Sequence, residues 1–341
     1  MRQIAVYENL PTDHPECFVE INAPMPEAQG HDILVKVKAI SVNPTDMKDR
    51  HGLTTRLADP LVLGWDLCGE VVSTGERVTK FSPGDMIIAA GDVERSGCYA
   101  DYMLVDQRLA GFKPSSLTDV EAATLSLTSL AAWEALFERL KIQTADVTAC
   151  PSLLIIGGAG GLGSMAIQFA RQFSGCRVIA TASRPETKEW CVKMGAHDVI
   201  DHAGDIEAQL ADLGEPSVTY ILICANNLPY WTLMSRIIAP EGAVCLVSST
   251  KEKLDLDLFM GKSVQINYEL MFTPSLYNTA KMWHQGAFLS SLSKMLDTSR
   301  ITHVMTENFG PMSPQTLAKA HARLESGKTV GKIALSAMEP E

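Results

Sequence analysis

A glycine-rich segment is the first place in the sequence where the residue types themselves suggest chemistry. The stretch IIGGAGGLGS begins at Ile155, directly after an apolar run, and its glycines fit the pattern G-x-G-x-x-G. Glycine permits positive φ and lets a pyrophosphate come close to the backbone, and the pattern lies between a predicted strand and a predicted helix. We therefore expect a dinucleotide at this helix N-terminus, in preference to a tight turn without a ligand. The candidate cofactor-binding residues of this loop are Gly158, Gly160, Gly161, Leu162 and Gly163.

The end of the following strand indicates which nucleotide is preferred. Sites for NAD usually place an acidic residue about 20 residues further on, where it binds the ribose hydroxyls. Here that position is Ser183, followed by Arg184, and Lys188 lies one helical turn later on the same face. A hydroxyl and two cations suit a 2′-phosphate, so we predict NADP(H). Residues 183–186 also fit a capping box with a solvated basic pair, and the two interpretations are compatible.

The elements that must position these residues differ along the chain. Residues 32–42 alternate apolar and polar, and glycine-bounded segments at 68–75 and 86–92 are strand candidates, which predicts a β-rich first part. Residues 119–140 have helical spacing. From residue 152 strands and helices alternate, which predicts a parallel sheet covered on both faces.

Composition and charge exclude several classes of protein. The 341 residues are 46% hydrophobic and 20% charged, a normal globular balance that allows two domains. A net charge of −11 argues against a nucleic-acid partner. No segment is apolar enough for a membrane span or a signal peptide, so we expect a cytoplasmic enzyme. The eight cysteines form no C-x-x-C pair, so neither a redox motif nor a cysteine-rich zinc site is predicted.

Several segments, in order across nearly the whole chain, resemble the medium-chain dehydrogenase/reductase superfamily in its quinone-oxidoreductase-like branch. The subgroup that the chain resembles most is that of zinc-type alcohol dehydrogenase-like proteins. This resemblance implies an α/β fold with a GroES-like β-rich catalytic domain at 1–122 and 266–341. It also implies a Rossmann NADP-binding domain with a doubly wound parallel sheet at 123–265, and a homodimer. The segments that carry it include AISVNPTDMKDRHG, LGWDLCGEVVSTGERVTKFSPGDMI, GCYADYMLVD, LSLTSLAAWEAL, LLIIGGAGGLGSMAIQFARQ and ESGKTVGKIAL.

The resemblance also allows the expected zinc ligands to be checked. In zinc-dependent relatives a Cys stands where this chain has Asn43, and a His-Glu pair stands where it has Trp65-Asp66. The third ligand falls near Leu127, and the region of the structural zinc offers only Cys98. Because zinc sites need several nitrogen and sulfur ligands, we expect no bound metal.

Without zinc, fewer classes of substrate can be activated for hydride transfer. Zinc would polarise an alcohol or carbonyl oxygen, whereas an enone or quinone can accept hydride when fixed donors stabilise the developing oxyanion. We therefore predict NADPH-dependent reduction of quinones or α,β-unsaturated carbonyls. Two alternatives stay open: an alcohol or aldehyde dehydrogenase, and a non-catalytic NADPH-binding protein.

Three residues are the candidate catalytic groups. The resemblance places Asn43 near the nicotinamide, where its amide could donate to substrate or cofactor, although Asn43-Pro44 could equally be a turn. Asp46 could order Asn43 or the ribose, or cap a helix. Trp65 would wall the substrate pocket or simply pack in the core. We do not expect Tyr99 to be an essential acid, since water can supply the proton.

Further cofactor contacts are expected elsewhere. Ligands of doubly wound sheets bind beyond the carboxyl ends of the strands, which favours Asn226 and Ser248. By resemblance, the remaining candidates are Thr128, Phe272, Thr273, Gly331 and Lys332.

Overall fold

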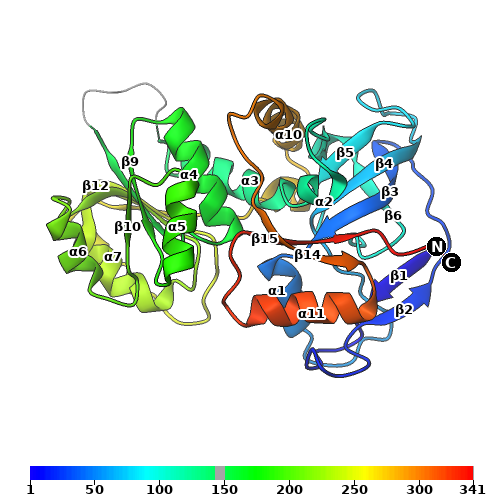
Figure 1. The fold of residues 1–341 in the computed structure, drawn as a ribbon, viewed down its shortest axis with the longest axis horizontal. Coiled ribbons are helices and arrows are strands. Elements are labelled where there is room, and N and C mark those ends of the chain that lie inside the picture. The colour runs from blue at the N-terminus through cyan, green and yellow to red at the C-terminus, as the bar shows by residue number, and fades with distance from the viewer. Residues whose placement is uncertain (143–149, 341) are drawn as a thin grey trace. The chain divides into compact units, whose positions relative to one another are not determined.

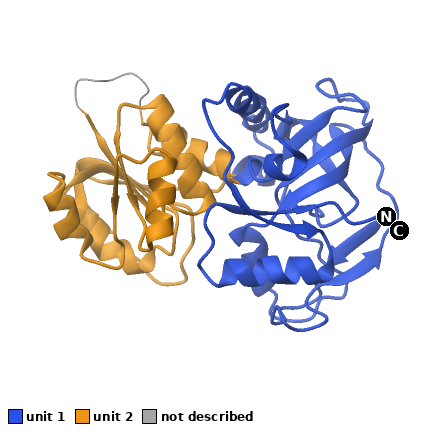
Figure 2. Cartoon of the chain, viewed as in Figure 1, with its two compact units in different colours: residues 1–127, 272–341 blue, residues 128–271 orange. Residues whose placement is uncertain are grey.

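The chain forms two compact units, and the second interrupts the first in sequence. The computed structural model describes residues 1–142 and 150–340. Unit 1 consists of residues 1–127 and 272–341, and unit 2 of residues 128–271 (Figure 2). The chain therefore leaves unit 1, builds unit 2 from one continuous segment, and returns to complete unit 1.

Unit 1 is built around a mostly antiparallel sheet in which the returning segment takes part, and β14 and β15 are its one parallel pair among the described strands. Its sheet runs in the order β14-β15-β3-β4-β5-β7, and β6 also pairs with β3 (Figure 1). The expected strand at 32–42 is β3, and it pairs with β4, β6 and β15. The elements of the first segment are β1 (Arg2–Ala5), β2 (Val19–Asn22), β3 (Asp32–Ser41), α1 (Pro44–His51), β4 (Leu67–Thr74), β5 (Met86–Ala89), β6 (Tyr102–Asp106), β7 (Ala110–Phe112) and α2 (Asp119–Ala122). Those of the returning segment are α9 (Thr273–Leu276), α10 (Met282–Asp297), β14 (Met305–Pro311), α11 (Pro314–Glu325) and β15 (Lys332–Ser336).

Unit 2 is a doubly wound parallel sheet, which confirms the predicted fold class. Its strands lie in the order β10-β9-β8-β11-β12-β13, and every pairing in it is parallel. The order reverses between β8 and β11, the position at which such sheets bind ligands. Its elements are β8 (Ser152–Ile156), α4 (Gly161–Phe173), β9 (Arg177–Thr181), α5 (Pro185–Lys193), β10 (Asp198–Ile200), α6 (Ile206–Asp212), β11 (Val218–Ile223), α7 (Trp231–Ile237), β12 (Ile238–Leu246), α8 (Asp257–Met260) and β13 (Gln265–Tyr268).

Helices cover both faces of this sheet, as the alternation of elements predicted. All five residues of β8 are buried, which is typical of a central parallel strand. Leu154 and Ile156 pack in one core with side chains of α6, α7 and α8, while α4 packs on β8 and β9. Among the described residues no helix is both long and apolar enough to cross a membrane.

The predicted helix at 119–140 is wrong as one continuous element. The structure has α2, then α3 (Ser126–Trp133), then a π-helical segment at Glu134–Arg139. Helix α2 ends at Ala122, and the hydroxyl of Thr124 then donates to the Glu121 carbonyl at 2.7 Å. The next helix, α3, begins at Ser126. The backbone N–H of Leu127, in the first turn of α3, donates to Asp66 Oδ1 at 3.0 Å. A tertiary contact therefore sets the start of α3, and helical periodicity alone does not reveal it.

Candidate cofactor and catalytic sites

The glycine loop of unit 2 joins the end of β8 to the start of α4, and its glycines have different roles. Gly157 has φ of +85°, which an L side chain rarely adopts. A Cβ at Gly163 would lie 2.4 Å from the Gly157 carbonyl oxygen, so this glycine permits the close approach of helix and loop. A Cβ at Gly160 would meet only that same oxygen, at 3.9 Å. Gly160 therefore leaves open space at the helix N-terminus, where a pyrophosphate would approach the backbone.

Neighbouring strands hold the loop in place. The N–H of Gly157 donates to the Thr181 hydroxyl at 3.0 Å, and the N–H of Gly158 donates to the Thr181 carbonyl at 3.1 Å. The Trp190 indole donates to the Ser164 hydroxyl at 2.7 Å, which ties α5 to the first turns of α4. Thr181 was not identified from the sequence, because its part in the loop depends on β9 lying beside β8.

The residues predicted to bind a 2′-phosphate lie together after β9. Arg184 is the N-cap of α5, and Thr187 completes its capping box, so the capping box expected at 183–186 is shifted by one residue. Arg184 pairs with Glu186 at 2.6 Å, and Lys188 with Asp201 at 3.1 Å. Such partly exposed pairs contribute little free energy, so a phosphate can replace the carboxylates.

A hydrogen bond joins the loops after β11 and β12, and it is made by Asn227, the neighbour of the predicted Asn226. The Asn226 side chain accepts a hydrogen bond from Leu228 N at 3.2 Å within its own loop. The neighbouring Asn227 is buried, and its amide donates to the carbonyl of Ser248. The loops that carry the predicted Asn226 and Ser248 are therefore held together at the carboxyl edge of the sheet.

Unit 1 contains a buried ion pair whose carboxylate, Asp66, lies at one of the positions where the sequence resemblance implies zinc ligands. Lys332 Nζ donates to Asp66 Oδ2 at 3.0 Å, to the Val42 carbonyl at 3.1 Å and to Asn43 Oδ1. The Asn43 amide donates to Asp66 Oδ2 at 3.2 Å, and Leu127 N binds the other Asp66 oxygen. The sequence positions of Asn43, Asp66 and Leu127 thus meet in space, around an ammonium group.

This geometry limits what two predicted site residues can do. All three N–H groups of the Lys332 ammonium have protein acceptors, so a contact with a cofactor would fall to its backbone or to Gly331, whose φ is +55°. The Asn43 amide also donates to the Ser41 carbonyl at 3.4 Å, and Asn43 is fully buried. Both side chains are therefore occupied in positioning their neighbours.

Burial and charge act against each other at Asp66. Burial raises the pKa of this carboxyl group, while Lys332 and the Leu127 N–H lower it. Removing the ammonium would leave a buried carboxylate without a cation.

Asp46 binds the backbone N–H of Asn43 and belongs to a second network of buried polar side chains. Asp46 Oδ2 accepts from Asn43 N and from the Tyr99 hydroxyl, both at 2.8 Å. The Tyr99 oxygen lies 3.1 Å from Nε2 of His321. Burial raises the pKa of Asp46 to about 7 against these hydrogen bonds, and burial lowers the pKa of His321 to about 3. Asp46 therefore completes the capping box of α1, whose N-cap is Asn43, so it both caps the helix and orders the Asn43 backbone, and Tyr99 is buried and directed at Asp46.

Trp65 is packed in the core beside another predicted site residue. Its exposed fraction is 1%, its ring meets that of Phe272 edge-on at 6.2 Å, and its indole donates to Asp49 at 3.0 Å. Phe272 and Thr273 lie at the start of α9 in unit 1, and Thr128 is buried within α3.

The donors at the zinc positions do not fit a zinc ion. They are an amide, an indole, an apolar side chain and a carboxylate that is already paired with an ammonium group, whereas zinc takes several thiolate, imidazole or carboxylate ligands. Within residues 1–142 and 150–340, no three His, Cys, Asp or Glu side chains are grouped so that they could hold a metal ion.

Comparisons with known proteins give consistent relationships. The alcohol dehydrogenase GroES-like domain family matches residues 29–115, and the zinc-binding dehydrogenase family matches residues 161–287. A zinc-type alcohol dehydrogenase-like protein of Staphylococcus aureus is 36% identical over 337 residues, which cover 98% of this chain and 100% of the relative. The 2-methylene-furan-3-one reductase of Solanum lycopersicum is 27% identical, over 93% of this chain and 74% of the reductase. A solved structure from Rhizobium etli, described as a zinc-dependent alcohol dehydrogenase protein, has 40% identity and a TM-score of 0.95 over 100% and 99% of the two chains.

The glycine loop yields a prediction that separates packing from binding. Gly163→Ala should lower the free energy of unfolding by about 1–3 kcal/mol, because its Cβ has no room. Gly160→Ala should cost less than about 1 kcal/mol, yet weaken NADPH binding at least tenfold. Urea unfolding and a fluorescence titration with NADPH measure the two effects. Equal losses of stability, or unchanged binding by Gly160→Ala, would contradict these roles.

The buried ion pair yields a second prediction. Lys332→Met should lower the free energy of unfolding by about 3–5 kcal/mol, because the buried Asp66 carboxylate loses its cation and must either stay charged or take up a proton. The double variant Lys332→Met with Asp66→Asn should recover a substantial part of that loss, since the amide still accepts from Leu127 N. Urea unfolding of both variants tests this, and a double variant less stable than the single one would argue against a coupled pair.

Proposed function

We propose that this chain, which belongs to the medium-chain dehydrogenase/reductase superfamily, reduces quinones or α,β-unsaturated carbonyls with hydride from NADPH. Oxidoreductase activity follows from the family. The choice of acceptor rests on one observation: Asp66, at a position where the resemblance implies a zinc ligand, is paired with the ammonium group of Lys332. Substrates that need a Lewis acid are thereby disfavoured, and acceptors with a conjugated carbonyl are favoured. A relative named as a 2-methylene-furan-3-one reductase acts, by that name, on such a conjugated carbonyl.

The residues of unit 2 fit a nicotinamide dinucleotide. The space at Gly160 and the N–H groups of the first turn of α4 would hold the pyrophosphate. No acidic side chain occupies the end of β9, and Ser183, Arg184 and Lys188 supply a hydroxyl and two cations for a 2′-phosphate. These residues support NADP(H) over NAD(H).

The residues of unit 1 act mainly by positioning. When bound, NADPH supplies the hydride for the β-carbon of an enone or for a quinone. Asp46 fixes the backbone of Asn43 and Lys332 fixes its amide, so the segment after β3 is held rigid from two sides. Trp65 and Phe272 pack edge-on against each other in the core of unit 1. Water is the proposed source of the proton that completes the product, because Tyr99 is buried against Asp46.

NADPH oxidation, followed by absorbance against a panel of quinones and enones, tests the proposed reaction. We expect turnover with NADPH that a chelator does not change, and weak turnover with NADH. Arg184→Gln with Lys188→Gln should raise KM for NADPH at least tenfold and leave KM for NADH nearly unchanged. Lys193→Gln, at the other end of α5, is the matched control.

Other outcomes would favour the competing functions. Activity with an alcohol that depends on added zinc would replace the proposal with an alcohol or aldehyde dehydrogenase. Tight NADPH binding without turnover on any acceptor would point to a non-catalytic NADPH-binding protein.

We further propose that the chain is a cytoplasmic homodimer that pairs through the edge of unit 2. Strand β13 is at the edge of its sheet, and exposed apolar side chains lie on and near it. An open edge with apolar side chains favours pairing with a second copy. These side chains are Leu256, Leu258, Met260, Tyr268 and Leu270.

The proposed dimer predicts a change of mass in solution. Tyr268→Glu should shift the protein from dimer to monomer in light scattering, because a charge would be buried in the interface. Tyr277→Glu alters a similarly exposed tyrosine of unit 1 and should leave the dimer intact. A monomeric parent protein at micromolar concentration would refute the proposal.

A further inference from the structure

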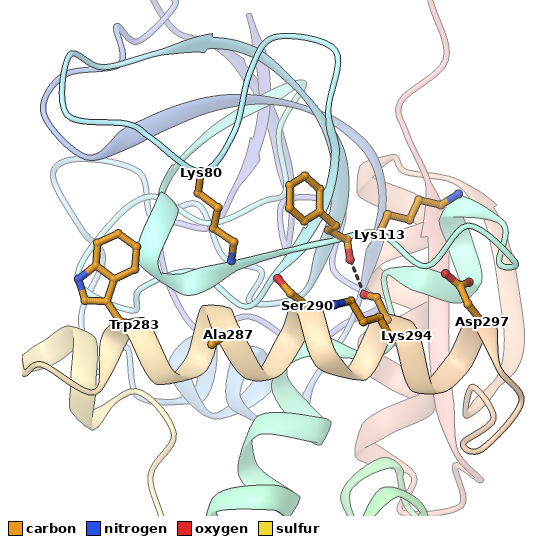
Figure 3. A pocket seen from close by; sticks show the side chains of 9 residues that line it. Lys80, Lys113, Trp283, Ala287, Ser290, Lys294 and Asp297 are labelled. Atoms are coloured by element: carbon orange, nitrogen blue, oxygen red, sulfur yellow. Dashed lines mark hydrogen bonds between the residues drawn. The ribbon is translucent and has the colours of Figure 1, made fainter.

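A pocket of about 500 Å³ lies in unit 1, along helix α10, and has no part in the proposed reaction (Figure 3). It lies between α10 and the segments around β7. None of the residues of the buried ion pair lines it. Its lining residues are Lys80, Phe112, Lys113, Trp283, Ala287, Ser290, Ser293, Lys294 and Asp297.

Among the described residues, no carboxylate pairs with the ammonium group of Lys80. Figure 3 shows its side chain pointing toward α10, and Nζ donates to the carbonyls of Ala110 at 2.6 Å and Gly286 at 2.9 Å. It also lies 4.9 Å from the centre of the Phe81 ring. Burial lowers the pKa of Lys80 to about 8, so the group remains mostly charged at neutral pH. An anion in the pocket would stabilise that charge.

The charged side chains in and beside the pocket sum to a net charge of one positive unit. Lys113 pairs with Asp119 at 3.1 Å. Asp297 accepts from Ser116 N at 2.9 Å. Burial raises the pKa of Asp297, but its hydrogen bonds lower that pKa by more, so the net shift is downward. In the described parts of the chain Lys294 has no ion-pair partner and is exposed. Three lysines face two carboxylates here, in a protein whose net charge is −11.

Aromatic rings form the walls of the pocket. Trp283 and Phe112 are 44% and 41% exposed, which is high for side chains of this size. The His31 ring meets Trp283 edge-on, with ring centres 6.2 Å apart. The hydroxyls of Ser290 and Ser293 donate to backbone carbonyls of α10 and β7, so they are already satisfied.

We propose that this pocket binds an aromatic monocarboxylate. The carboxylate would lie between Lys80 and Lys294, and the ring would lie against Trp283 and Phe112. A single excess positive charge suits a monoanion, and two half-exposed rings suit a flat apolar body. The site does not depend on the proposed reductase activity, because its residues are separate from those of the cofactor loop and the ion pair.

Calorimetric titration of the full chain with 1-naphthoate tests the proposal. We expect one molecule bound per chain, with quenching of tryptophan fluorescence that is lost in Trp283→Leu. Lys294→Gln and Lys80→Met should each weaken binding about tenfold or more, since each removes a charge-assisted contact. Lys319→Gln, an exposed lysine on α11, is the matched control and should bind like the parent. The neutral methyl ester of 1-naphthoate should bind at least tenfold more weakly than the acid.

Three results would overturn the proposal. They are an absence of saturable binding at millimolar 1-naphthoate, equal binding of the acid and its ester, and unchanged binding by Lys294→Gln. The last variant is decisive even if Lys80→Met fails to fold, because Lys294 is exposed on its helix. Binding that NADPH abolishes and the lysine variants do not affect would place the ligand at the proposed active site instead.

Discussion

The buried pair of Lys332 and Asp66 is the constraint on which the candidate site of unit 1 depends. Its two residues are 266 positions apart in sequence, and their side chains are almost completely removed from water. Through Asn43 and Leu127 the same pair fixes the segment after β3 and the first turn of α3. Since an unpaired buried charge is very costly, each of these segments is held where the charges can meet. The ion pair therefore holds together the positions at which the sequence resemblance implies zinc ligands.

The parts of this structure that could be predicted from sequence are those that depend on neighbouring residues. The glycine loop was identified because strand, glycines and helix follow one another within the stretch 152–173. The parallel sheet was predicted from the regular alternation of its elements, and the structure confirms it.

Contacts between distant segments explain what the sequence did not reveal. Lys332 was expected to face a cofactor, yet its ammonium is engaged by residues near the start of the chain. The helix expected at 119–140 is divided where Asp66 binds the start of α3. The aromatic and basic pocket combines side chains of α10 with others about 170 to 220 positions earlier, so no local pattern indicates it.

The interruption of unit 1 by unit 2 has a consequence for synthesis on the ribosome. Unit 2 is one continuous segment, 128–271, so all its strands are available as soon as that segment emerges. Unit 1 must wait, because β3 needs β15 as a neighbour and Asp66 needs the ammonium of Lys332. Domains generally fold as units during synthesis, so we expect the nascent chain to carry a folded parallel sheet while its first 127 residues still lack their partner strand. Chaperone demand should accordingly concentrate on the earliest residues made, not the latest.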